Sequence, residues 1–348
     1  MEASRSLSRR RFLAVGAGAA AAFTAAGLVP SDAWAHGGHR HGRRKPLIPK
    51  RRIGIQLFTV RDLLAADAAG TLAALAEIGY REVEVAGVPA GQTAASFRAL
   101  LDQNGLRAIG NHHFTGPALV PLFGDRPVEV ILDEAETLGQ KYTGTAAMSI
   151  PPGVVEGVGE PQTAERYKQL AELANQWGEA AAARGLRFYA HLHYWDFGTD
   201  PTTGEVLFQV LADETDEDLV WFEPDIFWMV FGDVDPLDWI PCFQDRFPLF
   251  HAKDGFPNPA GGYFNPGFTD LGEGEIDFSA IFGALDDPSR HHFIVERDDQ
   301  PHPLQTAEIA YDYLLDLRAP KHRRRGDDCG CGHDHDGRRH EGRRQAVR

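Results

Sequence analysis

The chain has 348 residues, of which 43% are hydrophobic and 24% charged, with a formal net charge of −15. This length holds one large domain or two small ones, and the composition is that of a globular protein with a sizeable core. Charge is unevenly distributed, because residues 53–317 contain 14 Lys/Arg and 43 Asp/Glu, a net of −29. A strongly acidic surface repels phosphate backbones, so nucleic acid is not an expected partner.

The first 35 residues have the features of a secretory signal peptide. Residues 9–13 read Arg-Arg-Arg-Phe-Leu, an apolar Ala/Gly-rich run follows to about residue 29, and Ala-Trp-Ala stands at 33–35. A basic start, an apolar stretch and a small-x-small site predict cleavage after Ala35. The paired arginines resemble the twin-arginine type, so we expect export to the periplasm or the medium. A membrane anchor is the alternative, but a run of about 18 residues rich in Ala and Gly is marginal for a span.

Low-complexity segments flank the central part of the chain. Residues 36–52 are rich in Gly, His and Arg and predict a mobile linker, while the His/Cys/Arg-rich residues 319–348 predict a disordered tail. Cys329, Cys331, His333 and His335 could chelate a metal, but their spacing matches no standard zinc module, which favours an incidental role. Only one further cysteine, Cys242, is present, so no disulfide framework is expected.

Short β-type runs alternate with amphipathic helical stretches between these ends. We predict strands at 53–60, 82–86, 108–112, 142–145, 187–193, 220–225, 249–253 and 293–296. Helices are predicted at 66–78, 94–104, 127–138 and 164–184, and glycines such as Gly79, Gly105 and Gly185 follow directly, as at helix C-termini. Eight β-then-α units predict a single (β/α)8 TIM barrel over 53–318. A doubly wound open sheet is the alternative, but no glycine-rich phosphate loop follows the first strand.

The two-residue alternation of side chains along each predicted strand shows which residues face the barrel interior and which face the helices. Between 187 and 193, Tyr189, His191 and His193 alternate with apolar residues, so they are predicted to point into the barrel. The same alternation selects one acidic or basic set in four more strands: Glu82, Glu84, Glu223, Asp225, His251, Lys253, Glu296 and Asp298. Active sites of TIM barrels lie at the C-terminal ends of the strands, where most of these residues fall.

Taken singly, an inward histidine is more often a hydrogen-bonded core residue than a ligand. Together the set indicates a metal centre, because buried charges are costly unless they are paired or bound to metal. Nitrogen and oxygen ligands suit one divalent ion such as Mn, Co, Zn or Mg better than soft copper.

Seven segments in consistent order resemble the xylose isomerase-like superfamily, in particular exported sugar phosphate isomerase/epimerase-like proteins. They are 54–62 (GIQLFTVRD), 79–84 (GYREVE), 191–193 (HLH), 225–228 (DIFW), 251–254 (HAKD), 271–278 (LGEGEIDF) and 295–300 (VERDDQ). The resemblance covers about residues 53–317 and implies a TIM barrel that binds one divalent ion through strands 5 to 8.

The resemblance also implies roles for individual residues. Its metal ligands fall on His191, Asp225, His251 and Glu296, although the sugar epimerases have Glu at the position of His191. Glu296 and His193 are the expected proton-transfer residues, and Lys253 is expected to hold a substrate oxygen. The remaining substrate contacts are expected from Gln56, Glu84, His112, Trp228 and Asp298.

The expected reaction is abstraction of a proton beside a carbonyl of a small carbohydrate, with isomerisation or epimerisation as the outcome. A metal-dependent lyase or dehydratase acting on keto-sugars, keto-glycosides or keto-inositols is the alternative, because elimination shares the same first step. An exported protein that binds sugar or metal without catalysis is an alternative of another class. The related abasic-site endonucleases bind DNA, which the acidic central region disfavours.

Overall fold

The computed structural model describes residues 45–113, 116–263, 265–299 and 301–320. The expected signal peptide, residues 36–44 of the expected linker and the tail from residue 321 lie outside the described residues, so those expectations stay predictions. No helix in the described ranges has the length and apolarity needed to cross a bilayer.

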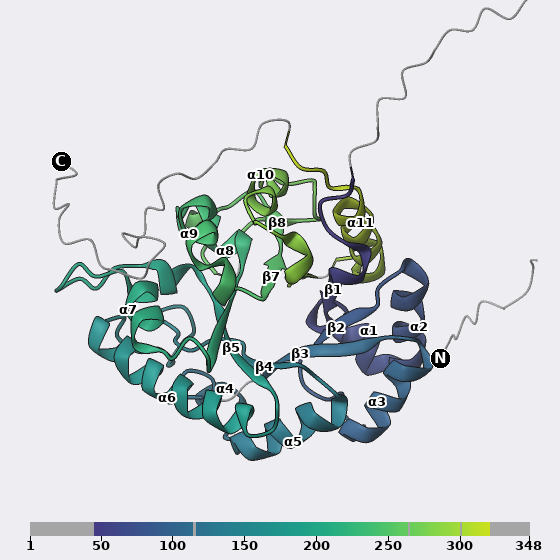
Figure 1. Cartoon of the computed structure of the whole chain (residues 1–348), viewed down its shortest axis with the longest axis horizontal. Coiled ribbons are helices and arrows are strands. Elements are labelled where there is room, and N and C mark those ends of the chain that lie inside the picture. Colours follow the sequence, from purple (N-terminus) through teal and green to yellow (C-terminus); the bar gives the residue numbers. More distant parts are fainter. Residues whose placement is uncertain (1–44, 114–115, 264, 300, 321–348) are drawn as a thin grey trace, which may run out of the picture. The chain divides into compact units, whose positions relative to one another are not determined.

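Eight parallel strands form the predicted barrel (Figure 1). They are β1 Ile53–Gln56, β2 Glu82–Val85, β3 Arg107–His113, β4 Tyr142–Thr145, β5 Arg187–Leu192, β6 Val220–Pro224, β7 Leu249–Ala252 and β10 His292–Val295. Neighbours pair in the order β6-β5-β4-β3-β2-β1-β10-β7. In the described residues, β6 and β7 are joined by a single parallel bridge between Asp225 and His251, which nearly closes the barrel. The fold predicted from the sequence is confirmed.

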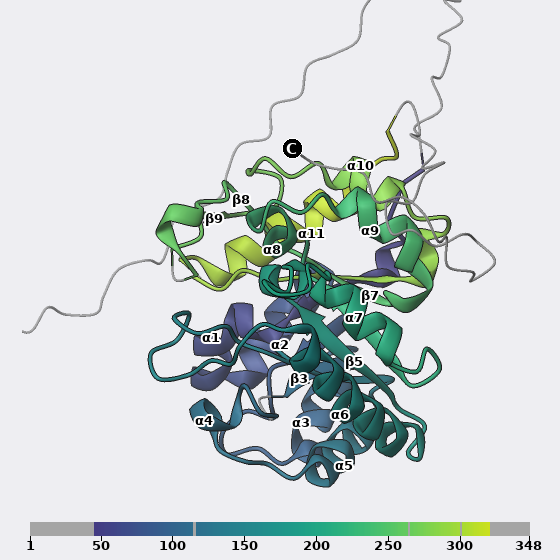
Figure 2. The ribbon, with the colours of Figure 1, turned by 90° about the vertical axis from the view of Figure 1, so that its left-hand side faces the viewer.

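Helices follow the strands and cover their outer faces (Figure 2). They are α1 Arg61–Ala66, α2 Ala68–Ile78, α3 Ala94–Gln103, α4 Val120–Phe123, α5 Val128–Leu138, α6 Ala164–Ala182, α7 Leu207–Glu214, α8 Ile226–Phe231, α9 Pro236–Phe243, α10 Phe278–Gly283 and α11 Pro303–Asp316. The outward residues of the strands, such as Phe188 and Ala190, are buried against these helices in one large hydrophobic cluster. A small antiparallel pair, β8 Asp254–Gly255 and β9 Phe268–Thr269, lies beyond β7.

The barrel domain begins earlier than the sequence predicts. Ile48 is fully buried in the main core, and the Leu47 N–H donates to the Leu317 carbonyl at 2.9 Å. Residues 46–52, expected to belong to the mobile linker, therefore pack on the barrel. The four apolar or proline residues of this segment stand side by side at 46–49 and show no helix or strand period, so the sequence pattern could not reveal this contact.

One local expectation needs correction. The first strand stops at Gln56 rather than residue 60, because the Gln56 side chain accepts a hydrogen bond from the Phe58 N–H and starts a 3-10 turn over Leu57–Val60.

Candidate metal centre and active site

The C-terminal ends of six strands deliver polar side chains to one end of the barrel interior. They are Gln56, Glu84, His112, His191, Glu223 and His251, all buried. A second set stands within three residues after the ends of the strands: His193, Asp225, Lys253, Glu296 and Asp298. Of these, Asp225 begins α8, where its Oδ1 accepts a hydrogen bond from the Trp228 N–H at 3.1 Å. The structure thus brings the sequence-predicted site residues into one cluster.

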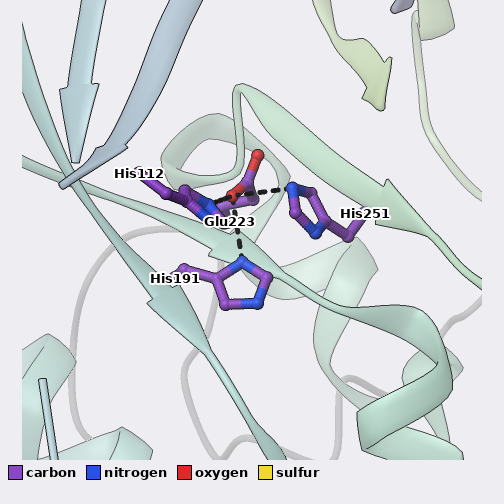
Figure 3. A group of neighbouring side chains, drawn as sticks. All are labelled: His112, His191, Glu223 and His251. Atoms are coloured by element: carbon purple, nitrogen blue, oxygen red, sulfur yellow. Dashed lines mark hydrogen bonds and ion pairs between the residues drawn. The ribbon is translucent and has the colours of Figure 1, made fainter. Parts of the chain in front are cut away.

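Glu223 lies at the centre of three imidazoles (Figure 3). Its Oε2 is 2.7 Å from His112 Nε2, 2.9 Å from His191 Nδ1 and 3.3 Å from His251 Nε2. The second oxygen, Oε1, is buried and has no hydrogen-bond partner among the described residues. The sequence pattern placed Glu223 on the inward face but assigned it no role. Its spacing of two residues from Asp225 was the signal available.

Glu84 is held from below by neutral donors. Gln56 Nε2 donates to Glu84 Oε2 at 2.8 Å, and the Tyr189 hydroxyl donates to Glu84 Oε1. The ring of Tyr189 fits beside Gly144 of β4, where an added Cβ would approach the ring to 2.5 Å. Tyr189 was predicted to face inward without an assigned role, and it positions the carboxylate that contacts His251 Nε2 at 2.7 Å.

The oxygens of Asp225 and Glu296 lie on the other side of the histidines. His251 Nδ1 is 2.9 Å from Glu296 Oε2 and 3.9 Å from Asp225 Oδ2. His191 Nε2 also lies 3.9 Å from Asp225 Oδ2. This oxygen is buried without a hydrogen bond from the described residues, although the Lys253 ammonium stands 3.1 Å away.

Two overlapping groups of side chains could hold a metal ion. One comprises His112, His191, Glu223 and His251, and the other comprises Asp225, His251 and Glu296. In the second group, separations of 2.9 to 3.9 Å fit ligand atoms that stand about 2.0–2.2 Å from a common ion.

The orientation of two histidines favours the second group, with His191 as a fourth ligand. Each turns one ring nitrogen toward Asp225 and the other toward a buried glutamate, which is Glu223 for His191 and Glu84 for His251. Metal-binding histidines usually donate their other N–H to a carboxylate in this way, which fixes the tautomer and the ring. Nitrogen and carboxylate oxygen together suit a borderline or hard divalent ion.

Electrostatics couple the members of the cluster. Burial and the neighbouring Glu84 charge raise the pKa of Glu223 to about 7. Burial opposes protonation of His251, but the carboxylates of Glu223 and Glu296 outweigh it and raise the His251 pKa well above its usual range. For Glu296, burial is outweighed by Lys253 and His251, which hold its pKa well below the usual range. Four carboxylates, the Lys253 ammonium and imidazoles with raised pKa values are therefore buried together, and binding of a divalent cation would release protons from its ligands.

Lys253 and His193 stand where the cluster opens to the outside. The Lys253 ammonium lies 2.9 Å from Glu296 Oε2 and 3.1 Å from Asp298 Oδ1, rather than pairing with Asp254 or Glu223 as a structural lysine could. The His193 ring stacks on Trp195 at 4.3 Å and 7°, and Asp196 Oδ2 accepts a hydrogen bond from its backbone N–H at 2.7 Å. Burial, with the Lys253 charge, lowers the pKa of His193 well below its usual range, so this imidazole is neutral in the absence of a bound molecule and its affinity for a proton is weakened.

A cavity of about 680 Å³ leads to this cluster. It is lined by Gln56, His112, His191, His193, Trp228, Lys253, Glu296 and Asp298. Of the residues predicted to contact substrate, Glu84 does not line the cavity and instead supports His251 from beneath. His112 lines the cavity and also belongs to the first possible metal group.

Most of the barrel matches a known protein family in sequence. Residues 72–317 match the family described as xylose isomerase-like TIM barrels. The chain belongs to this family. Most of the barrel, including every residue of the cluster except Gln56, falls within the matched segment.

Inosose dehydratases are among the curated proteins that resemble the chain in sequence. The inosose dehydratase of Clostridium perfringens is 31% identical over 165 residues, which cover 43% of this chain and 54% of the relative. That of Lactiplantibacillus plantarum is 27% identical over 167 residues, 44% of this chain and 54% of the relative. The chain thus spans about half the length of the curated relatives it matches.

Solved structures share the fold over most of the barrel. A sugar phosphate isomerase/epimerase from Parabacteroides distasonis superposes with a TM-score of 0.62 at 21% identity, covering 78% of this chain and 96% of that one. The IOLI protein with a binding zinc atom superposes with a TM-score of 0.58 at 14% identity, covering 76% and 97%. At these identities the likeness establishes the fold.

Proposed function

We propose that the protein is a metal-dependent carbohydrate lyase that removes water, or another β-substituent, from a keto-sugar or keto-inositol. The observation that carries the proposal is the buried cluster of imidazoles and carboxylates that opens onto a cavity through His193, Lys253 and Glu296. The inosose dehydratase relatives favour elimination over the isomerisation expected from the sequence.

His191, Asp225, His251 and Glu296 would hold one divalent ion, with Mn, Co, Zn and Mg as the candidates. Such an ion supplies Lewis-acid polarisation of a carbonyl and charge stabilisation of the enediolate that follows. Glu223 and Glu84 would orient the two ligand imidazoles by accepting their second N–H groups.

The chemistry of the chain's own residues begins with proton abstraction. His193, which lines the cavity and has an unpartnered Nδ1 among the described residues, takes the proton from the carbon next to the carbonyl. Lys253 donates a hydrogen bond to a substrate oxygen and remains charged beside Glu296 and Asp298. In a dehydration, the His193 imidazolium then passes its proton to the β-hydroxyl as the C–O bond breaks, and water leaves.

Isomerisation or epimerisation is the second candidate function. It uses the same first step, and the isomerase/epimerase from Parabacteroides distasonis shares the fold. Here the proton would return to a neighbouring carbon or to the opposite face of the same carbon, with Glu296 as the other acid–base group. The cavity contacts of His193 and Glu296 permit either outcome.

The deciding experiment incubates the metal-loaded protein in deuterated water with a panel of inososes, ketoses and 3-keto-glycosides. We expect deuterium at the α-carbon, followed by a product that has lost its β-substituent. Deuterium in a product of unchanged composition would identify an isomerase or epimerase instead. Absence of exchange from every compound, with metal and sugar both bound, would leave a binding protein without catalysis.

Export by the twin-arginine route is part of the proposal and rests on residues 1–35 of the sequence. Replacement of Arg9 and Arg10 by lysine should keep the protein in the cytoplasm, which fractionation and immunoblotting would detect. Equal export of the replaced and natural chains would remove this part of the proposal.

A further inference from the structure

The cavity has two chemically different halves. The half next to the metal ligands is polar, with His112, His191, His193, Lys253 and Asp298 at its wall. The half toward the outside is lined by aliphatic residues from the loops after β1, β2, β3 and β4, among them Leu57, Val88, Leu119, Leu122, Ile150 and Val155. We call these two parts the polar half and the apolar half.

A separate hydrophobic cluster builds one wall of the apolar half. Ala118, Leu119, Ala147, Ile150 and Trp195 are buried together and are not part of the main barrel core. Val154, Val155 and Tyr263 pack against them. These residues come from loops that are far apart in the sequence, so their convergence is a property of the folded chain.

The apolar half offers few groups that could bind hydroxyls. Arg61 is its one charged side chain in the described part of the lining. The Arg61 guanidinium already donates to the carbonyls of Phe58 and Asp298 and lies 4.0 Å from the centre of the Phe58 ring. Leu122 at the rim is 40% exposed, which is unusual for a large aliphatic side chain in this protein.

Two unpartnered polar atoms mark the border between the halves. His193 Nδ1 and Trp195 Nε1 are buried and have no hydrogen-bond partner in the described residues. Both residues line the cavity, and their rings stack on each other. A buried N–H or ring nitrogen without a partner is costly, so an oxygen of a bound molecule at this border would satisfy them.

The size of the cavity also exceeds what the polar half needs. At about 680 Å³ it lies in the middle of the range of about 300–1,000 Å³ that holds drug-sized ligands. A single sugar ring carries hydroxyls in all directions, and hydroxyls turned toward aliphatic side chains would lose their hydrogen bonds to water without replacement. A sugar ring alone would therefore fill the polar half and leave the apolar half without a complementary partner.

We propose that the natural substrate is a glycoside whose sugar ring occupies the polar half and whose uncharged, apolar aglycone occupies the apolar half. This inference rests on the proposed function for the identity of the sugar end. The linking oxygen lies at the border, next to His193 and Trp195. Burial of the aglycone against Leu119, Ile150 and Val155 provides binding that a free sugar lacks.

The test measures binding without turnover, so that it does not depend on the chemistry. Phenyl β-D-glucopyranoside and methyl β-D-glucopyranoside are titrated into the metal-loaded full chain, with tryptophan fluorescence as the signal, because Trp195 and Trp228 line the cavity. We expect the phenyl glycoside to bind at least tenfold more tightly than the methyl glycoside. Equal affinity, or binding of neither compound, would overturn the inference.

A pair of matched variants locates the effect. Leu122→Asp places a charge on the rim of the apolar half and should reduce the preference for the phenyl glycoside to about twofold or less. Val130→Asp is the control, because Val130 in α5 is similarly exposed, at 45%, and does not line the cavity. Retention of the full preference in Leu122→Asp would contradict the proposal, as would its loss in Val130→Asp.

Other outcomes separate this inference from the proposed function. If no keto-sugar is turned over but the phenyl preference and its loss in Leu122→Asp persist, the lyase proposal fails and the aglycone site stands. If Leu122→Asp instead converts an oligomer into a monomer in light scattering, the apolar half is a subunit interface and the inference is wrong.

Discussion

Two glutamates on one strand show how differently this barrel treats a buried charge. Glu82 and Glu84 stand two residues apart on β2, face the same interior and are both fully buried. Glu82, at the end where the strands begin, meets the Arg107 guanidinium at 2.6 Å and His292 Nδ1 at 2.6 Å. Glu84, at the end where the strands finish, meets His251, His112, Gln56 and Tyr189 but no guanidinium or ammonium group in the described structure.

The difference lies in whether the charge has a permanent partner. An arginine is always protonated, so Glu82 is neutralised whatever the metal content of the protein. The imidazoles that contact Glu84 can lose a proton and bind a metal through the free nitrogen. The charge beside Glu84 therefore depends on whether the metal site is occupied. Inward carboxylates therefore have to be sorted by their partners before a function is assigned to them.

The largest expected effect is the loss of metal binding when Glu296 is replaced. Glu296→Ala should abolish binding of the divalent ion, because it removes the carboxylate 2.9 Å from His251 Nδ1, and the other carboxylate near this nitrogen, that of Asp225, is already a proposed ligand. Metal content per chain after gel filtration is the measurement. Glu82→Gln is the matched control and should keep its metal. Full metal content in Glu296→Ala would remove the assignment of the site.

His193 tests the division between binding and proton transfer. His193→Gln should retain the metal and lower α-proton exchange about a hundredfold, which is the usual cost of losing a general base. Exchange is followed by mass spectrometry in deuterated water, with metal content measured on the same sample. Loss of the metal would instead make His193 a ligand, and unchanged exchange would remove it from the chemistry.

The comparison of the two glutamates is sharpened by replacing each with glutamine. Glu84→Gln should weaken metal affinity by about 10- to 100-fold, as loss of a carboxylate behind a ligand histidine does. Glu82→Gln should leave the affinity unchanged and lower the thermal midpoint, because it weakens the contacts with Arg107 and His292. The reverse pattern would show that the lower carboxylate, not the upper one, supports the metal.

The last expected effect is on stability rather than on metal binding or exchange, and it concerns Asp196, which is buried and contacts His193 and Tyr167. Burial raises its pKa to about 7, so the folded chain prefers the protonated acid. The stabilising contribution is complete below pH 4 and is lost as the pH rises to about 7, by at most about 1.4 kcal/mol per pH unit. Asp196→Asn should lack this loss. Denaturant unfolding of both chains between pH 4 and pH 8 measures it, and parallel curves would contradict the assigned cause.

The fold and the inward faces of the strands could be read from the sequence, because both depend on local periods. Alternation along 187–193 and 249–253 identified His191 and His251 as inward residues, and both lie in the cluster. The predicted strand ends were displaced at Gln56, where a side chain hydrogen bond to Phe58 ends the strand.

Other features depend on contacts between distant segments, which no local pattern encodes. Glu223 became the meeting point of three imidazoles only when β3, β5 and β7 were brought around β6. The same holds for the apolar half of the cavity, since Leu119, Ile150 and Trp195 belong to three loops with no shared period. The metal-binding, catalytic and substrate-binding roles of the cluster residues stay predictions.

The bridge between Asp225 and His251 implies that the proposed metal centre also stabilises the closure of the barrel. These two proposed ligands are also the residues at which β6 and β7, the last strands in the pairing order, meet. An ion bound to both residues would link β6 to β7 where the barrel closes. Removal of the ion would therefore weaken the contact between these two strands as well as abolish activity. Amide hydrogens of β6 and β7 would then exchange faster in the metal-free chain, while those of β2 and β3, far from the seam, would keep their protection.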